Sequence, residues 1–110
     1  MRPSYVVKRV PLRADPLPLE SVAQAEEQML RATLGAEIAS REIRPIGGVD
    51  AICMELTFAS PDGPVRQAHV SMVKGRWYLA FVATALDDLA FGGVRERLLD
   101  LVATAEISSS

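Results

Sequence analysis

Three alternating segments between residues 51 and 84 constrain the fold of this chain more than any other feature. They are separated by the turn signals Pro61-Asp62-Gly63 and Lys74-Gly75, and apolar residues recur at every second position along them. A period of two is typical of a strand with two different faces, and short Gly-containing turns connect antiparallel strands. Residues 51–84 therefore predict a three-stranded antiparallel meander.

The register of this meander decides which side chains share a face, because a shift of one residue exchanges the two faces. A three-residue loop at Pro61-Asp62-Gly63 would place Ser60 opposite Pro64, and a hairpin at Lys74-Gly75 would place Met72 opposite Trp77. Both registers collect one apolar set on a single face. We predict that this face is buried and consists of Ile52, Met54, Leu56, Phe58, Ala68, Val70, Met72, Trp77, Leu79 and Phe81.

Two further strands are predicted before the meander. The β-branched run Tyr5–Val10 favours a strand that leads into a Pro-rich loop. Residues 36–46 also favour a strand, but Ile38 and Ile43 have opposite parities, so a bulge is needed near residues 40–42.

Two amphipathic helices complete the predicted elements. The first begins at Pro18 and stops at Gly35, with a stripe of Val22, Ala25, Met29 and Ala32, and with the pair Glu26-Glu27 on its solvated side. The second carries the stripe Phe91, Val94, Leu98, Leu101 and Val102, and is capped by Asp87 or Asp88.

The expected fold is α+β: an antiparallel sheet with the two helices packed on one face, and with the other face open and concave. Its length of 110 residues suits one domain over residues 1–110, with residues 1–4 and 106–110 frayed. The net charge of −2 argues against phosphate-driven nucleic-acid binding. A single Cys and the lack of an apolar run for a signal or a span predict a cytoplasmic protein that does not insert into a membrane.

The open face of the predicted meander carries the functional hint. It interleaves small apolar residues with short hydrogen-bonding groups, with Glu55 opposite His69 and Thr57 opposite Gln67. Such a surface suits a shallow binding floor, although the same polar pairs could simply satisfy one another on a wet face. The candidate binding residues are Glu55, Thr57, Val65, Gln67, His69, Ser71, Tyr78, Ala80 and Val82.

An enzyme is the alternative from another class. Glu55, His69 and Tyr78 could act as base, acid and oxyanion donor of a small isomerase or cyclase, if they met in a closed pocket. With one His and one Cys in the chain, we expect no metal site, no cofactor and no Cys/His nucleophile.

The spacing and hydrophobic character of several segments resemble the DcrB-like domains of the PsbP-like fold, and most of all the Eag chaperones of type VI secretion. The resemblance covers about residues 5–105 and rests on Pro18–Ser21, Ile43–Ala51, Phe58–Gly63, Val65–Val70 and Gly75–Phe81.

This resemblance implies a cytoplasmic homodimeric chaperone, without enzymatic activity, that holds the apolar N-terminal transmembrane helices of a secreted effector. In such chaperones, polar side chains of a concave sheet face bond to the client helices, and Gln67 and His69 match the position of that polar strand. Relatives usually have another strand or hairpin before the segment that resembles Tyr5–Val10. Either the sheet here is smaller or a partner completes it, and the exposed strand edge would favour dimerisation. PsbP-like folds also serve as accessory or assembly modules, which is a third possibility.

Overall fold

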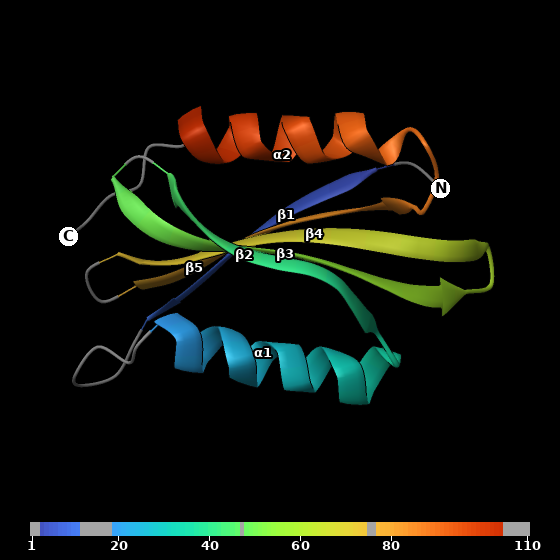
Figure 1. The fold of residues 1–110 in the computed structure, drawn as a ribbon, viewed down its shortest axis with the longest axis horizontal. Coiled ribbons are helices and arrows are strands. Elements are labelled where there is room, and N and C mark those ends of the chain that lie inside the picture. The colour runs from blue at the N-terminus through green and yellow to red at the C-terminus, as the bar shows by residue number, and fades with distance from the viewer. Residues whose placement is uncertain (1–2, 12–18, 47, 75–76, 105–110) are drawn as a thin grey trace.

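The computed structural model describes residues 3–11, 19–46, 48–74 and 77–104, which form five strands and two helices (Figure 1). The elements are β1 (Ser4–Pro11), α1 (Leu19–Leu34), β2 (Glu37–Ile46), β3 (Val49–Ser60), β4 (Gly63–Lys74), β5 (Trp77–Leu86) and α2 (Phe91–Thr104). Every strand pairing is antiparallel and the strand order is β1-β5-β4-β3-β2. The prediction of an α+β fold with an antiparallel sheet is confirmed.

The two helices lie on opposite faces of the sheet, as Figure 1 shows with α2 above and α1 below. α1 packs on β3 and β4, and α2 packs on β5 and β4 from the other side. We call these two surfaces of the sheet the α1 face and the α2 face. The prediction that both helices cover one face and leave the other open and concave is wrong.

The turn between β3 and β4 explains this error. Ser60 pairs with Gly63, so the loop contains two residues rather than three, and the register differs by one from the predicted one. The Ser60 hydroxyl donates to the Gly63 carbonyl at 2.7 Å and accepts from the Asp62 amide at 3.3 Å. Because a one-residue shift moves every side chain of a strand to the opposite face, the apolar row of β3 joins the polar row of β4.

Each face of the sheet consequently has its own apolar cluster. The α2 face holds the larger one, in which Phe91, Val94, Leu98 and Val102 of α2 pack on buried residues of β3, β4 and β5. The α1 face holds a smaller cluster, formed by Ala36, Met54 and Leu56 with the partly buried Leu30, Ile38 and Phe58. A sheet with apolar residues on both faces needs cover on both, which is why the helices separate.

The second hairpin keeps the predicted faces with a different pairing. Met72 lies opposite Leu79 rather than Trp77, and Lys74 lies opposite Trp77. The difference is two residues, and an even shift leaves every side chain on its face. The predicted turn residue Gly75 lies outside the described residues, as do Gly47 and Pro18.

Several local predictions can be compared with the structure. α1 ends at Leu34, and Gly35 follows with a φ of 64°, as expected for a glycine at a helix end. At the start of α2, the Asp88 carboxylate accepts from the Ala90 amide at 2.9 Å. The β2 register shifts between Ile38 and Ser40, slightly before the predicted bulge. Ser4 pairs with Thr84 and is not frayed.

Candidate functional site

The structure divides the predicted binding residues between the two faces of the sheet. The strand registers place Val65, Gln67, His69, Ser71, Tyr78, Ala80 and Val82 on the α1 face. Glu55 and Thr57 lie on the α2 face, where they pair with Ala68 and Arg66. The predicted contacts of Glu55 with His69 and of Thr57 with Gln67 are therefore wrong, for the register reason given above.

The polar residues of the α1 face lie beneath α1 rather than in solvent. Gln67, His69, Ser71 and Tyr78 form what we call the polar patch. His69 is 4% exposed, and Ser71 and Tyr78 are also buried. The His69 Nε2 and Gln67 Oε1 atoms are 2.9 Å apart, within hydrogen-bond distance. These four polar candidates share one face of the sheet, but α1 of the same chain packs on that face.

Glu26 of α1 completes this cluster and was missed by the sequence analysis. It accepts a hydrogen bond from the Tyr78 hydroxyl, and its Oε1 atom lies 3.9 Å from His69 Nδ1. Its side chain is only 13% exposed, whereas Met29 of the predicted buried stripe is 52% exposed. Leu19, Glu26 and Leu30 lie on one side of the helix, so the helical period could have placed Glu26 on the side that faces the sheet. A carboxylate is rarely assigned to a buried position, which is why Glu26 was missed.

Burial and charge perturb two titrations in the polar patch. Burial holds the pKa of His69 below its ordinary value; the Glu26 carboxylate opposes this effect and Lys8 adds to it. Burial also raises the pKa of Tyr78, and the hydrogen bond to Glu26 acts in the same direction. At neutral pH the patch therefore contains a neutral imidazole and a protonated phenol.

The neutral imidazole leaves one buried atom unsatisfied. With Nε2 donating to Gln67 Oε1, the Nδ1 atom of His69 carries a lone pair, and it has no hydrogen-bond partner among the described residues. A carboxylate cannot donate to it, and the 3.9 Å to Glu26 exceeds hydrogen-bond distance. The polar patch thus holds an unused acceptor near the Glu26 carboxylate to which Tyr78 donates.

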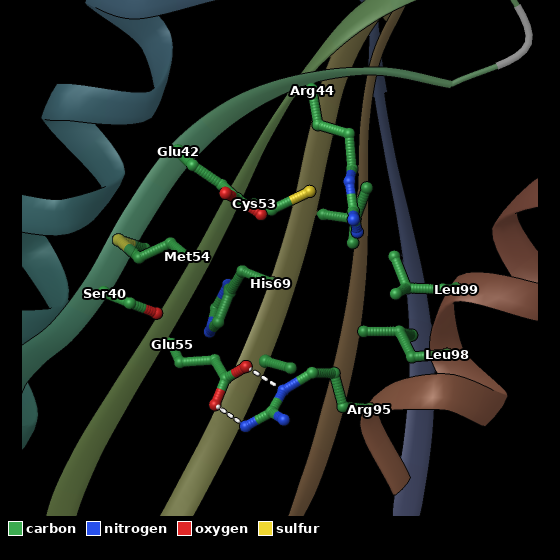
Figure 2. Close-up of a pocket in the computed structure, with 12 residues that line it drawn as sticks. Ser40, Glu42, Arg44, Cys53, Met54, Glu55, His69, Arg95, Leu98 and Leu99 are labelled. Atoms are coloured by element: carbon green, nitrogen blue, oxygen red, sulfur yellow. Dashed lines mark hydrogen bonds and ion pairs between the residues drawn. The ribbon is translucent and has the colours of Figure 1, made fainter. Parts of the chain in front are cut away.

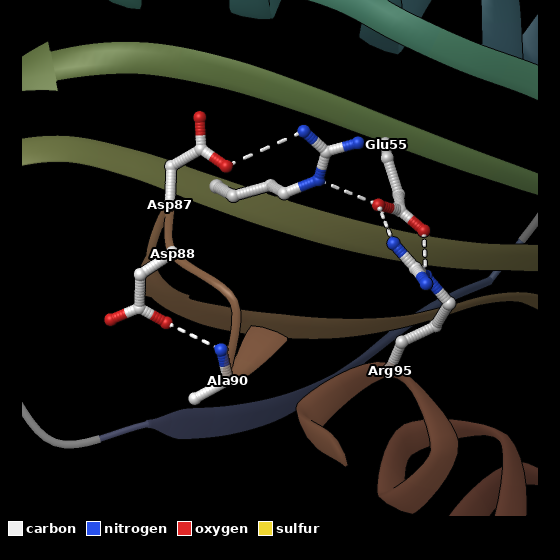
Figure 3. A network of polar contacts seen from close by, with 6 residues as sticks. Glu55, Asp87, Asp88, Ala90 and Arg95 are labelled. Carbon is white, nitrogen blue, oxygen red and sulfur yellow. Dashed lines mark hydrogen bonds and ion pairs between the residues drawn. The ribbon is translucent and has the colours of Figure 1, made fainter. Parts of the chain in front are cut away.

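Glu55 lies on the α2 face, where two arginine side chains bind its carboxylate (Figure 3). It accepts from Arg66 Nε at 2.7 Å and from two nitrogens of Arg95 on α2, one of them at 2.7 Å. Arg66 also approaches Asp87 at 3.5 Å. Burial alone would raise the pKa of Glu55, but the two arginines outweigh it and hold that pKa below its ordinary value. Glu55 therefore links α2 to the sheet.

The cavities do not assemble the predicted catalytic trio. A cavity between α2 and the β2–β3 edge has a volume of about 60 Å³. Its lining includes Glu55, His69 and Arg95 but not Tyr78 (Figure 2). A second depression, of about 340 Å³, contains Thr57 and Asp87 and neither His69 nor Tyr78. Pockets for organic ligands span roughly 300–1,000 Å³. Neither of these two cavities brings Glu55, His69 and Tyr78 together, so neither supports the enzyme alternative.

An exposed apolar strip adjoins the polar patch on the α1 face. Val6 and Val10 of β1 are 56% and 36% exposed, and Val82 of β5 pairs with Val6 and is half-buried. We call Val6, Val10 and Val82 the apolar strip. Lys8 lies between the two β1 valines on the same face, because alternate residues of a strand point the same way. The two β1 valines are exposed, and α1 packs mainly on β3 and β4.

Other kinds of site find no support in the described part of the chain. No group of three or more His, Cys, Asp or Glu residues among the described residues could hold a metal ion. Neither described helix has the length and apolar character that a membrane crossing requires.

Comparison with known proteins identifies a shared fold. No family model matches the chain, and no curated protein matches it. The crystal structure of a protein of unknown function from Pseudomonas aeruginosa, PA94, is similar with a TM-score of 0.72; the match covers 97% of this chain and 86% of that one. The sequence identity is 10%, so the likeness extends to the fold alone.

Proposed function

We propose that this protein is a non-enzymatic chaperone or adaptor, and that it binds an apolar helix of a secreted effector on the α1 face of its sheet. The chemistry of that face supports the proposal. Its polar patch already holds one helix, α1, through a hydrogen bond between side chains, and the apolar strip beside it is exposed. An apolar helix that carries an occasional polar residue needs these two kinds of surface together.

The dimensions of the sheet also support a second helix on this face. Strands lie about 4.8 Å apart and a helix with its side chains is about 10 Å wide, so one helix covers about two strands. α1 packs on β3 and β4, and on the β1 side of the face Val6 and Val10 are left exposed. These valines belong to the apolar strip, and their exposure is the single observation that carries the proposal.

A matched pair of substitutions in β1 tests the proposal. Val6 and Val7 are neighbours with similar exposure, 56% and 64%, but they pair with Val82 and Phe81 and so face opposite sides of the sheet. The probe is an apolar helix of about 20 residues, the length of a membrane span, with one central Ser, fused to a soluble carrier protein. The two purified proteins are mixed, and binding is measured by fluorescence anisotropy.

Val6→Lys should weaken binding about tenfold, because a charge replaces a valine whose burial contributes roughly 1.5 kcal/mol. Val7→Lys should leave binding within about twofold of the wild type, since it lies on the α2 face. Equal effects of the two substitutions, or no binding of the probe by the wild-type protein, would refute the proposed function.

A further inference from the structure

The apolar strip has a positive charge at its centre. Lys8 lies between Val6 and Val10 on the α1 face and is exposed, as they are. We infer that the client helix carries an Asp or Glu side chain that pairs with Lys8, and that this ion pair selects the client and fixes its position along β1. This inference rests on the proposed function, since it assumes a helix on the apolar strip, and it adds the chemistry of that helix.

The three carboxylates of α1 are engaged elsewhere on the same face. Glu20 and Glu27 approach Arg41 of β2 at 2.6 and 3.6 Å. Glu26 accepts a hydrogen bond from the tyrosine of the polar patch. Lys8 has no hydrogen bond and no ion pair with any residue that the structure describes. A client helix on the apolar strip would therefore meet a cation that α1 does not neutralise.

The neighbouring cation of β1 is held differently. Arg9 points to the α2 face, where its guanidinium carbon lies 3.8 Å from the centre of the Trp77 ring. Lys8 points to the other face, and its partner on β5 is the small residue Ala80. The charge of Lys8 also contributes to the lowered pKa of His69, so its positive potential acts on the α1 face. The apolar strip is thus both apolar and electropositive.

A helix that covers the apolar strip would remove water from around Lys8. Loss of water is unfavourable for a charge that gains no partner, whereas a carboxylate on the helix would pair with the ammonium. An uncharged helix can still bind, because the long Lys8 side chain can turn its ammonium to water beyond the sheet edge. The ion pair therefore discriminates between clients more than it supplies affinity.

The geometry of β1 sets the spacing that the client needs. Val6 and Val10 are about 13 Å apart along the strand, with Lys8 midway between them. A helix rises about 1.5 Å per residue, so the client residues above the two valines are about eight or nine positions apart. Residues four apart share one side of a helix. The expected client pattern is an Asp or Glu with apolar residues about four positions before and after it.

Matched probes test the charge. The carrier-fused apolar helix carries Glu in place of its central Ser (the Glu probe) or Gln there (the Gln probe), and anisotropy measures binding. The wild-type protein should bind the Glu probe about fivefold more tightly than the Gln probe, equivalent to about 1 kcal/mol. Lys8→Gln should reduce this preference to less than twofold, and Lys8→Glu should reverse it. Arg9→Gln removes the same charge from the α2 face, so it is the control and should keep the preference.

A second pair of probes tests the spacing. Ser placed four positions before and four positions after the Glu should weaken binding of the Glu probe to the wild-type protein about fivefold, because the valines lose their apolar partners. Ser placed two positions before and two positions after lies on the opposite side of the helix and should change binding less than twofold. Equal effects of the two replacements would overturn the expected pattern.

The outcomes separate this inference from the proposed function. If the Gln probe binds the wild-type protein as tightly as the Glu probe, or if Lys8→Gln keeps the preference, the inference is overturned. It is also overturned if Arg9→Gln removes the preference as Lys8→Gln does. In each case the proposed function stands when Val6→Lys, but not Val7→Lys, weakens binding of the Gln probe. If no probe binds to any variant, the proposed function and the inference are both overturned.

Discussion

Substitution of Glu55 by Gln separates a structural role of this residue from the binding role that the sequence predicted. The Glu55 carboxylate accepts hydrogen bonds from Arg66 on β4 and from Arg95 on α2. A buried hydrogen bond to a charged group contributes about 1.5–3 kcal/mol, whereas an exposed ion pair contributes about 0–1 kcal/mol. The Arg66 side chain is 22% exposed and the Arg95 side chain is 44% exposed, so the first bond counts nearly fully and the second is strongly screened.

We therefore expect Glu55→Gln to lower the free energy of unfolding by about 2 kcal/mol, or the midpoint of thermal unfolding by about 8 °C. Urea denaturation followed by circular dichroism measures the change. Glu42→Gln, at an exposed position on the neighbouring strand, is the control and should alter stability by less than about 0.5 kcal/mol. Binding of the client helix should not change, because Glu55 lies on the α2 face.

The dependence on pH supplies an independent check of the same contact. The pKa of Glu55 is lower in the folded protein than in the unfolded chain, so its contribution is fully present above the unfolded value of about 4.3 and is lost as the pH falls through the folded value. The stability difference between the wild type and Glu55→Gln should therefore be constant from pH 7 to pH 5 and shrink below about pH 4. A difference under about 0.5 kcal/mol, or one that is the same at pH 3 and pH 7, would refute this account.

Three further predictions follow from other parts of the structure. Leu56→Ala, at a fully buried position under α1, should lower the free energy of unfolding by about 2–5 kcal/mol in urea denaturation; a loss below about 1 kcal/mol would contradict the placement of Leu56. Gly63→Ala should lower it by about 1–3 kcal/mol, because Gly63 has a φ of 118° with open space around it, and an unchanged midpoint would mean that the turn differs. The pKa of His69 is lowered on folding, so the contribution of its neutral form to stability is complete above the unfolded value of about 6.5 and declines as the pH falls toward the folded value. His69→Gln should therefore make the midpoint of thermal unfolding depend less on pH between pH 7 and pH 5. The same pH dependence in both proteins would argue against a buried neutral imidazole.

Much of the local structure follows from neighbouring residues alone. The β-branched run of β1, the opposite parities of Ile38 and Ile43, and Gly35 at the end of α1 act over a few residues, and each predicted its feature to within about two positions. The apolar rows of β3, β4 and β5 were likewise correct as rows. The alternation within one strand does not specify which side chains of the neighbouring strand lie on the same face of the sheet.

The candidate site shows the same division. The alternation within β4 and β5 was assigned correctly, so His69, Ser71 and Tyr78 were correctly predicted to share one face of the sheet. Glu55 was grouped with them through an incorrect loop length, and Glu26 was left out because a carboxylate was assigned to the solvated side of its helix. A two-residue and a three-residue hairpin at Pro61-Asp62-Gly63 are both compatible with the local turn chemistry.

The sequence by itself determined the number and kind of elements, the alternation within each strand, and the places where the chain turns, because these depend on contacts between residues close along the chain. Only the tertiary structure decided that the helices lie on opposite faces, that Glu55 binds Arg66 and Arg95, and that Glu26 lies on Tyr78. The physical reason is the one-residue choice of the β3–β4 turn. The length of this turn decides which apolar side chains share a face of the sheet, and each apolar face must be covered by a helix. The choice therefore depends on residues that are remote in the chain.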